Sequence, residues 1–321
     1  MPANKVSFKT ALQDGDLKAI RSVPKSDLHN HCMLGGKASV INRFYGEKLK
    51  PFRAEKMGIG PLNNWIAEVY KPFMERPGAF EKAVEAAFIQ AKHDGIKILE
   101  MSMDGFFGSL FNVSVERAVG SLKHYHALIA PEIDFRPELG FPKTLPLRTI
   151  LKHLEPFLAC DYFRSIDLYD DEKGQPLENF RELYRFVRKA GLKLKAHAGE
   201  FGDAESVRKA VEILELEEVQ HGIGAADSPE VMRWLAANSI RLNICPESNI
   251  KLKRVRSYKT HPIRILYDHG VNVTVNSDDA LLFRAGVSEQ FLRLYNSGLF
   301  SAGELETIRL NGLSSAVRNI Q

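Results

Sequence analysis

Short β-rich apolar runs alternate with helix-patterned stretches along nearly all of this 321-residue chain. Consecutive parallel strands need a crossover helix, so this alternation favours a parallel sheet, and eight strand–helix units can close into a (β/α)8 barrel. The predicted strands are Ser26–His31, Ile96–Met103, Ile133–Gly140, Phe163–Tyr169, Leu192–Ala198, Glu218–Ile223, Arg241–Cys245 and Val271–Asn276. Helical spacing predicts helices over Ala79–His93, Leu177–Ala190, Ala204–Leu214, Ser228–Ala237 and His261–His269.

Two stretches depart from the regular alternation. Pro137 interrupts the third predicted strand, which weakens that assignment because proline cannot donate to a strand ladder. The segment Cys32–Asp94 is too long for a plain loop, so we expect a helical insert that covers the barrel mouth. No stretch rich in Pro, Gly or Ser divides the chain, and we therefore expect a single metal-dependent hydrolase barrel domain over residues 1–321.

Charge and composition exclude several classes of function. The formal net charge is only +4 and no dense Lys/Arg block is present, which argues against a nucleic-acid partner. No apolar run reaches the roughly 18 residues of a membrane span. Met1–Leu17 has no apolar core of a signal peptide, and three widely spaced cysteines fit a reducing compartment. We therefore expect a cytoplasmic protein that binds neither membrane nor nucleic acid.

Candidate functional residues gather where the predicted strands end, which is where a barrel of this type builds its active site. Five of the eight predicted strands end in such residues. These ends carry His29-Asn30-His31, His197-Ala198-Gly199-Glu200, His221-Gly222, Cys245-Pro246-Glu247-Ser248-Asn249 and Ser277-Asp278-Asp279.

His29 and His31 suggest a metal site. Side chains at i and i+2 of a strand point the same way, so two imidazoles converge on one point. An HxH pair alone arises often by chance, but His197, His221 and Asp278 stand at three further strand ends. Three histidines and a carboxylate suit one Zn²⁺, with Fe²⁺ or Mn²⁺ as alternatives.

Carboxylates near these histidines could carry protons. Glu200 follows His197 by three residues and can lie near a metal without binding it, as a proton shuttle requires. The alternative is a solvated loop acid. Asp278 and Asp279 are adjacent and should point in different directions, which suggests separate roles. The alternative for this pair is capping of a helix N-terminus.

The chain resembles the adenosine deaminase family, within the amidohydrolase-like metal-dependent hydrolases. The resemblance rests on segments that occur in order from Asp27 to Ala316, and so it covers nearly the whole chain. These segments are DLHNH, KAHAGE, VQHGIG, NICPESN, HPIRILYDHGVNVTVNSDD and SAGELETIRLNGLSSA. The family has the (β/α)8 barrel fold.

The resemblance implies roles for particular residues. One zinc ion would be held by His29, His31, His197 and Asp278. Glu200 would protonate the ring nitrogen next to the attacked carbon, while His221 would take a proton from the attacking water or orient it. Asp279 would accept a hydrogen bond from the far side of the heterocycle. The implied reaction replaces an aromatic amino group by oxygen and releases ammonia.

The residues expected around the substrate differ from the family pattern. The acid that usually follows HxH, and that contacts a sugar hydroxyl, is absent from Cys32-Met33-Leu34-Gly35-Gly36. Asp170 stands where glycine is usual, Ser102 where arginine is usual, and Ala280 where proline is usual. A buried carboxylate needs a donor. Met33 and Asp170 therefore predict an aminated heterocycle other than adenosine, either a free base or a modified nucleoside; alternatively, Asp170 points to solvent.

Two other functions remain open at this point. A phosphoesterase or cyclic-amide hydrolase could use the same barrel, but such enzymes usually bind two metals through a bridging carboxylate or modified lysine. No lysine stands at the end of the fourth predicted strand. A ligand-binding barrel without catalysis is the other alternative, and Glu200 with His221 argues against it, because a binding protein needs no proton shuttle.

Overall fold

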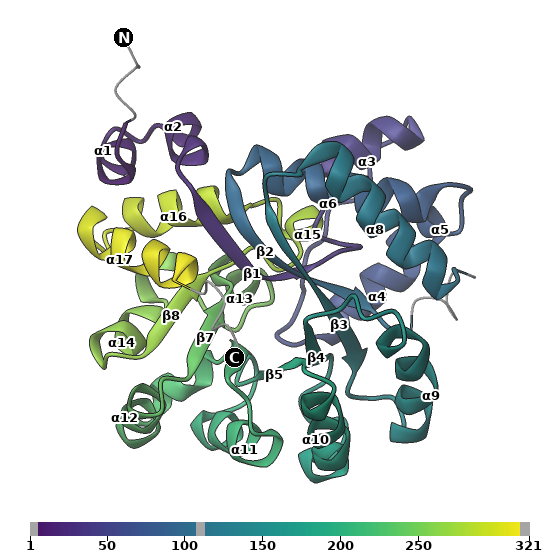
Figure 1. Cartoon of the computed structure of the whole chain (residues 1–321). Coiled ribbons are helices and arrows are strands. Elements are labelled where there is room, and N and C mark those ends of the chain that lie inside the picture. The colour runs from purple at the N-terminus through teal and green to yellow at the C-terminus, as the bar shows by residue number, and fades with distance from the viewer. Residues whose placement is uncertain (1–5, 107–112, 315–321) are drawn as a thin grey trace.

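Eight parallel strands form the centre of the molecule, in the order β1 to β8. The computed structural model describes residues 6–106 and 113–314, and Figure 1 shows helices arranged around the strands. The strands are β1 (Lys25–His31), β2 (Ile96–Asp104), β3 (Asp134–Pro142), β4 (Ser165–Tyr169), β5 (Lys193–Ala198), β6 (Glu218–His221), β7 (Arg241–Ile244) and β8 (Asn272–Val275). The barrel prediction and its strand assignments are confirmed, with bounds that differ by a few residues.

The first and last strands meet just beyond the end of β8. Asn30 and Asp278 form a parallel bridge. The Asp278 amide donates to the His29 carbonyl at 2.9 Å, and the His31 amide donates to the Asp278 carbonyl at 3.3 Å. These bonds join β1 to the segment after β8, so the sheet curves into a nearly closed barrel.

Helices occupy the connections between strands, as the alternation predicts. Those before β3 are α1 (Phe8–Gln13), α2 (Leu17–Ser22), α3 (Ala38–Tyr45), α4 (Gly60–Trp65), the π-helical turn η1 (Ile66–Tyr70), α5 (Lys71–Met74), α6 (Ala79–His93) and α8 (Val115–Ile129). Those between β3 and β7 are α9 (Leu147–Leu158), η2 (Leu177–Phe180), α10 (Arg181–Lys189), α11 (Ala204–Leu214), η3 (Ile223–Asp227) and α12 (Pro229–Ala237). Those after β7 are α13 (Pro246–Lys251), η4 (Tyr258–Thr260), α14 (Ile263–Asp268), α15 (Ala280–Phe283), α16 (Val287–Asn296) and α17 (Ala302–Leu313).

The insert between β1 and β2 is helical, as expected. It holds α3, α4, η1 and α5 before the crossover helix α6. Side chains of its middle part, including Leu62 and Ile66, line the cavity at the mouth of the barrel. The predicted covering of the mouth is therefore confirmed. The last two residues of the tail segment that resembles the family, Ser315 and Ala316, lie outside the described residues.

Pro137 lies inside β3 and does not end it. Its carbonyl accepts the Arg164 amide at 2.8 Å, one residue before β4 begins. The β3–β4 ladder starts at the next residue pair, Glu138 with Ser165. Because the proline nitrogen lies before this ladder begins, its inability to donate removes no bond from the β3–β4 pairing.

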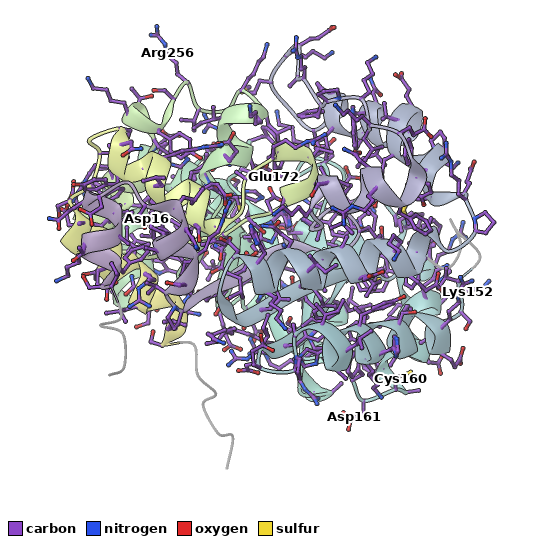
Figure 2. All side chains as sticks on the ribbon, turned by 90° about the horizontal axis from the view of Figure 1, so that it is seen from above. Asp16, Lys152, Cys160, Asp161, Glu172 and Arg256 are labelled. Atoms are coloured by element: carbon purple, nitrogen blue, oxygen red, sulfur yellow. The ribbon has the colours of Figure 1, made fainter. Side chains whose placement is uncertain are left out.

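The outside of the molecule is rich in charged side chains. Lys152, Asp161 and Arg256 are exposed and lie at the edge of the outline in Figure 2. Among residues 6–106 and 113–314, no helix combines the length and the apolar character needed to cross a membrane.

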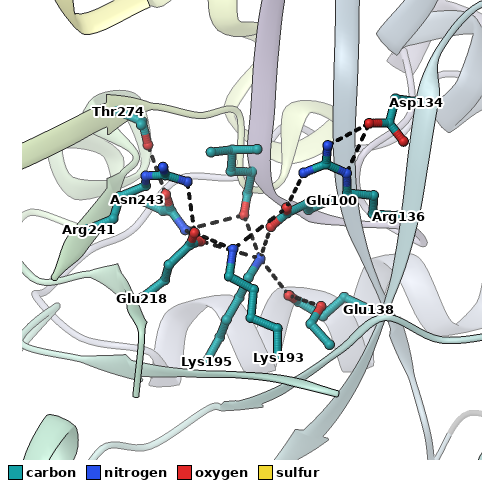
Figure 3. A network of polar contacts seen from close by, with 12 residues as sticks. Glu100, Asp134, Arg136, Glu138, Lys193, Lys195, Glu218, Arg241, Asn243 and Thr274 are labelled. Atoms are coloured by element: carbon teal, nitrogen blue, oxygen red, sulfur yellow. Dashed lines mark hydrogen bonds and ion pairs between the residues drawn. The ribbon is translucent and has the colours of Figure 1, made fainter. Parts of the chain in front are cut away.

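The barrel interior contains a charged layer where such barrels usually pack branched aliphatic residues. Lys195 on β5 is fully buried and lies against Glu100, Glu138 and Glu218, as Figure 3 shows. Its Nζ is 2.7 Å from Glu138 Oε2 and donates to the Leu28 carbonyl at 3.2 Å. Burial alone would lower the pKa of Lys195, but the three carboxylates raise it above its usual value.

Outer cations complete this charged layer. Arg241 lies 2.8 Å from Glu218, and Arg136 lies 3.3 Å from Glu100. Lys193 also pairs with Glu218. Each buried carboxylate in this layer therefore has at least one cation, which offsets the cost of removing its charge from water. The layer lies below the site, because Lys195 precedes His197 by two residues on the same face of β5.

Candidate active site

Four histidines from three strands meet at one end of the barrel. His29 and His31 come from β1, His197 from β5 and His221 from the end of β6. The ring of His29 lies at the centre, with centroid distances of 5.0 Å to His31, 4.7 Å to His197 and 4.9 Å to His221. The structure thus brings together the histidines that the sequence selected.

Asp278 lies against this group of rings. Its Oδ1 is 3.7 Å from His29 Nε2 and 3.4 Å from His31 Nε2. Its Oδ2 is 3.9 Å from His221 Nε2. One carboxylate therefore faces three of the four imidazoles across distances that leave room for a cation between the ligand atoms.

The central ring, His29, is fully buried. Neither of its nitrogens has a hydrogen-bond partner among the described residues. Burial lowers the pKa of His29 well below its usual value, and the neighbouring histidines lower it further, so the ring is neutral. A buried polar atom without a partner is costly, and a neutral imidazole is the form that binds a metal.

Several donor sets have all their ligand atoms within 4.8 Å of one another. The sets are His29 with His31 and His197, His29 with Cys245 and Asp278, His31 with Asp278 and Asp279, His197 with Glu200 and His221, and His29 with Glu138 and Asp167. The first set is a three-imidazole cluster of the kind that holds Zn²⁺. The residues present therefore fit a single divalent metal.

Two of these residues have backbone conformations that side chains seldom adopt. The φ angles of His221 and Asp278 are +64° and +58°. Residues held in this left-handed region cost about 1–3 kcal/mol each and occur often at active sites. His221 is the last residue of β6, and Asp278 follows the end of β8 by three residues, so both conformations occur where the chain leaves the barrel.

A polar network below the site fixes the loop that carries Asp278. Asp27 accepts the Ser277 amide at 3.0 Å and the Ser277 hydroxyl at 2.5 Å. Asn30 donates to the Ser277 hydroxyl oxygen at 2.7 Å. Burial raises the pKa of Asp27 to about 7, against the lowering effect of these bonds. The sequence gave Asp27 and Asn30 no role, although both belong to the DLHNH segment.

Glu200 faces the histidines from the loop after β5. That loop begins at Gly199, whose φ is +67° and whose missing Cβ would lie 2.2 Å from a Val207 methyl carbon. Glu200 is buried, and its Oε2 is 3.7 Å from His221 Nε2. Burial and the Asp278 carboxylate raise the pKa of Glu200 well above its usual value, which favours the protonated carboxyl.

Asp279 is buried beside Asp278. Its position is the N-cap of α15, but its side chain makes no capping hydrogen bond. The Oδ1 atom has no hydrogen-bond partner among the described residues. Burial raises the pKa of Asp279 well above its usual value, with further contributions from Asp278 and Glu200. Asp279 therefore occupies the N-cap position that the sequence suggested as an alternative, but its side chain does not cap the helix and is available to a ligand.

A cavity of about 300 Å³ opens above these side chains. Its size is at the lower end of small-molecule sites. Most of its wall is apolar, with Met33, Leu62, Ile66 and Phe283 among the lining residues. The three residues expected near the substrate, Met33, Asp170 and Asp279, all line it.

Asp170 already has donors for both carboxylate oxygens. Oδ1 accepts from Asn63 Nδ2 of helix α4 at 3.1 Å, and Oδ2 accepts from Thr144 Oγ1 at 2.8 Å. Its φ is +77°, so the position has the backbone conformation that glycine adopts most readily. The side chain therefore links the insert to the loop after β3 at the edge of the cavity.

Several residues of the site received no role from the sequence. Asp167 is fully buried on β4, and its Oδ2 lies 3.1 Å from His197 Nε2. Burial alone would lower the pKa of His197, but Asp167 raises it to about 9. Asp104 at the end of β2 also lines the cavity, and burial raises its pKa to about 6. Strand-end position is the signal that could have identified Asp104, whereas Asp167 lies in the middle of β4.

Comparison with known proteins places these residues in context. The chain matches the model of the family described as adenosine deaminase over residues 147–320. A relative from Treponema pallidum (strain Nichols), named for adenosine/adenine deaminase, is 32% identical over 292 residues, which cover 91% of this chain and 98% of the relative. The solved adenine deaminase from Arthrobacter aurescens has a TM-score of 0.81 and 26% identity, covering 92% of this chain and 94% of that chain.

A second solved structure shares the fold at lower identity. It is an amidohydrolase from Burkholderia ambifaria with bound Zn, and its TM-score is 0.80 at 20% identity. The superposition covers 99% of this chain and 91% of that chain. At this level of identity the likeness concerns the barrel alone.

Proposed function

Because this chain belongs to the adenosine deaminase family and is therefore a hydrolase of C–N bonds, we propose that it is a zinc-dependent deaminase of a purine-like heterocycle other than adenosine. The observation that carries the proposal is the convergence of two further imidazoles and Asp278 on His29. The buried nitrogens of His29 have no hydrogen-bond partner among the described residues. The substrate is a small heterocyclic amine.

The metal ligands in this proposal are His29, His31, His197 and Asp278. The first three offer nitrogens within 4.8 Å of one another, and Asp278 adds a carboxylate that faces His29 and His31. Zinc bound there would lower the pKa of the attacking water toward about 7. The zinc found in the Burkholderia ambifaria protein agrees with this choice over Fe²⁺ or Mn²⁺.

Glu200 is the proton donor to the heterocycle. Attack at the carbon that bears the amino group increases the negative charge on the neighbouring ring nitrogen, and a carboxyl that holds its proton at neutral pH can neutralise it. The burial of Glu200, which raises its pKa, favours the protonated carboxyl that this step needs. General acid catalysis of this kind contributes about 10²- to 10⁴-fold in rate.

His221 and Asp279 act on either side of the reacting ring. Burial lowers the pKa of His221 well below its usual value, so its neutral imidazole can accept a proton from the water or orient it. The free Oδ1 of Asp279 can accept a hydrogen bond from the edge of the heterocycle or, with its raised pKa, donate one.

The walls of the cavity favour a free base or a modified nucleoside. Met33 is buried at the position where the family usually has the acid that contacts a sugar hydroxyl. Its carbonyl accepts the Tyr70 hydroxyl, which fixes this turn against the insert. Adenine is the first candidate, because the Arthrobacter aurescens protein is an adenine deaminase. Asp170 contributes a carboxylate at the rim, and each of its oxygens can accept a second hydrogen bond from the substrate besides those from Asn63 and Thr144.

The test combines metal analysis with measurement of the released amine, which is ammonia from adenine and adenosine and methylamine from the N6-methyl derivative of each. We expect about one zinc per chain and a higher kcat/KM for adenine or an N6-methyl compound than for adenosine. Adenosine as the best substrate would overturn the substrate assignment. Two metals per chain would favour the phosphoesterase or cyclic-amide hydrolase alternative, and tight binding without release of ammonia or methylamine would favour a binding protein.

The variant Glu200→Gln tests the proton donor. The amide has nearly the same shape but cannot supply the proton, so we expect unchanged zinc content and a fall in kcat of about 10²- to 10⁴-fold. Circular dichroism serves as the control for folding. Full activity in this variant would mean that another group is the acid.

A further inference from the structure

Glu172 holds the loop that carries Glu200 by both oxygens of its carboxylate. Oε2 accepts the Gly199 amide at 2.7 Å, and Oε1 accepts the Phe201 amide at 2.7 Å. The two bonded amides belong to the residues immediately before and after Glu200. Glu172 comes from the loop after β4, and its label in Figure 2 lies inside the outline of the molecule.

Other contacts fix the same segment from further sides. The Glu200 carbonyl accepts from Arg254 Nε at 3.1 Å, and the Gly199 carbonyl accepts the Gly224 amide at 2.8 Å. Lys143 Nζ donates to the Glu172 carbonyl, which anchors the loop that carries Glu172. The backbone on both sides of Glu200 is therefore fixed by groups from three other loops.

The approach of Glu172 leaves no space for a side chain at position 202. A Cβ on Gly202 would lie 2.8 Å from Glu172 Oε2 and 2.3 Å from the Ser206 hydroxyl oxygen. Glycine at this position lets the carboxylate reach the backbone. The contact therefore depends both on the Glu172 carboxylate and on the absence of a side chain at Gly202.

We propose that Glu172 is a positioning residue, which sets the location of the Glu200 carboxyl through the backbone of residues 199–201. This inference rests on the proposed function, in which Glu200 is the proton donor. A carboxylate can accept both amides at once, because each oxygen takes one N–H. The carboxamide of a glutamine has a single acceptor oxygen, so it can bond only one of the two backbone amides. Its NH₂ group would face the N–H of the other amide, and two donors repel.

The effect on catalysis follows from the geometry of proton transfer. A catalytic acid must lie within hydrogen-bond reach of the atom it protonates. A displacement of about 1 Å can cost about 10²-fold in rate. Glu172→Gln should therefore lower kcat by about 10²-fold, with KM and zinc content within about twofold of the parent.

A double-mutant cycle with Glu200→Gln isolates the proposed route. If Glu172 acts through Glu200, Glu172→Gln should lower the residual kcat of the Glu200→Gln enzyme by less than about threefold, because coupled residues are not additive. An equal loss in both backgrounds would overturn the proposal. Full activity of Glu200→Gln alone would instead overturn the proton donor of the proposed function, so the two failures are distinguishable.

Two further variants control for charge and for folding. Asp171→Asn removes the same charge one residue earlier, at an exposed side chain whose one hydrogen bond within residues 6–106 and 113–314 comes from the nearby Lys173 amide. This variant should leave kcat within about twofold. Glu172→Asp keeps both acceptor oxygens on a shorter side chain. We expect it to recover part of the kcat lost in Glu172→Gln and to stay folded if Glu172→Gln does not. If Glu172→Asp has a native circular dichroism spectrum but recovers none of the lost kcat, the positioning role is contradicted.

Discussion

At the scale of single residues, His221 and Asp278 have left-handed backbone conformations without being glycine. Glycine would adopt these conformations at lower cost, but it would remove an imidazole and a carboxylate from the site. The cost of these two backbone conformations is therefore offset by the imidazole and the carboxylate that they place in the site. Asp278 is held in place by bonds from its peptide to β1 and by the Asp27–Ser277 contact.

The first prediction concerns the metal role of Asp278. Zinc at about 100 times its Kd should stabilise the folded parent by about 2.7 kcal/mol. Asp278→Ala removes one proposed ligand, so we expect this zinc-dependent shift in thermal unfolding to fall sharply. Asp279→Asn is the matched control, because it changes the adjacent carboxylate and should keep the shift. An undiminished shift in Asp278→Ala would exclude Asp278 as a ligand.

The second prediction concerns His261, which is buried behind the site. The Asn249 side-chain oxygen lies 3.2 Å from its Nε2, and its Nδ1 accepts the Ile263 amide at 3.1 Å. Burial lowers the pKa of His261 to about 3, against about 6.5 in an unfolded chain. Below pH 6.5 the unfolded state binds the extra proton, so the stability contributed by neutral His261 is present above that pH and lost as pH falls toward 3.

The expected size is about 1.4 kcal/mol of unfolding free energy per pH unit within that window. Urea unfolding of the parent and of His261→Gln between pH 7 and 4 measures it. The difference between the two proteins should shrink as pH falls, because only the parent carries this histidine. A difference that does not change with pH would refute the assignment.

At the scale of elements, β5 carries both the charged layer and the site. Lys195 lies under three carboxylates and His197 lies two residues later at the site. The alternation of a strand places both inside the barrel. A hydrophobic residue at position 195 would leave Glu100, Glu138 and Glu218 without their shared cation, which is the costly way to break a buried ion pair.

The third prediction follows from this layer. Lys195→Met should lower the free energy of unfolding by about 3–5 kcal/mol, measured by the midpoint of urea denaturation. Lys97→Met is the control, because Lys97 lies on another barrel strand, β2, with an exposed side chain and should change stability by less than about 0.5 kcal/mol. A similar small change in Lys195→Met would show that its charge is dispensable.

Elements were predictable from sequence where local pattern decides them. The apolar runs and their spacing predicted the strands, and strand alternation predicted that His29 and His31 share a face. Pro137 looked disruptive, since the sequence did not reveal that its nitrogen lies before the β3–β4 ladder begins. The position of Asp170 in the cavity wall was expected, but its bonds to Asn63 and Thr144 were not. These partners come from distant segments that no local pattern connects.

At the scale of the whole molecule, the fourth prediction concerns domain number. The described strands pair in sequence order, and a bridge joins β1 to the segment after β8. We expect a one-domain chain to unfold in a single cooperative transition. Far-ultraviolet circular dichroism and tryptophan fluorescence should give the same midpoint in urea. Two separated transitions would contradict the prediction of a single domain over residues 1–321.

Contacts between distant residues explain what sequence reasoning missed in the site. Glu172 gives no local signal of its role, because its partners are backbone amides of another loop. Asp104 ends β2 and Asp167 lies in the middle of β4, but single aspartates also occur in solvated loops. The histidine cluster was recognisable from the sequence because several histidines recur at strand ends, whereas each of these two acids stands alone.

The closure of the barrel also sets when the site can form. Asp27 and Ser277, whose contact fixes the loop of Asp278, are 250 positions apart in the chain. At about 5–20 residues per second, a ribosome needs on the order of 10–50 s to travel between them. During that interval the nascent chain has its first two histidines without the aspartate that faces them. A metal that needs all of the proposed ligands would therefore bind only after nearly the whole chain has been synthesised.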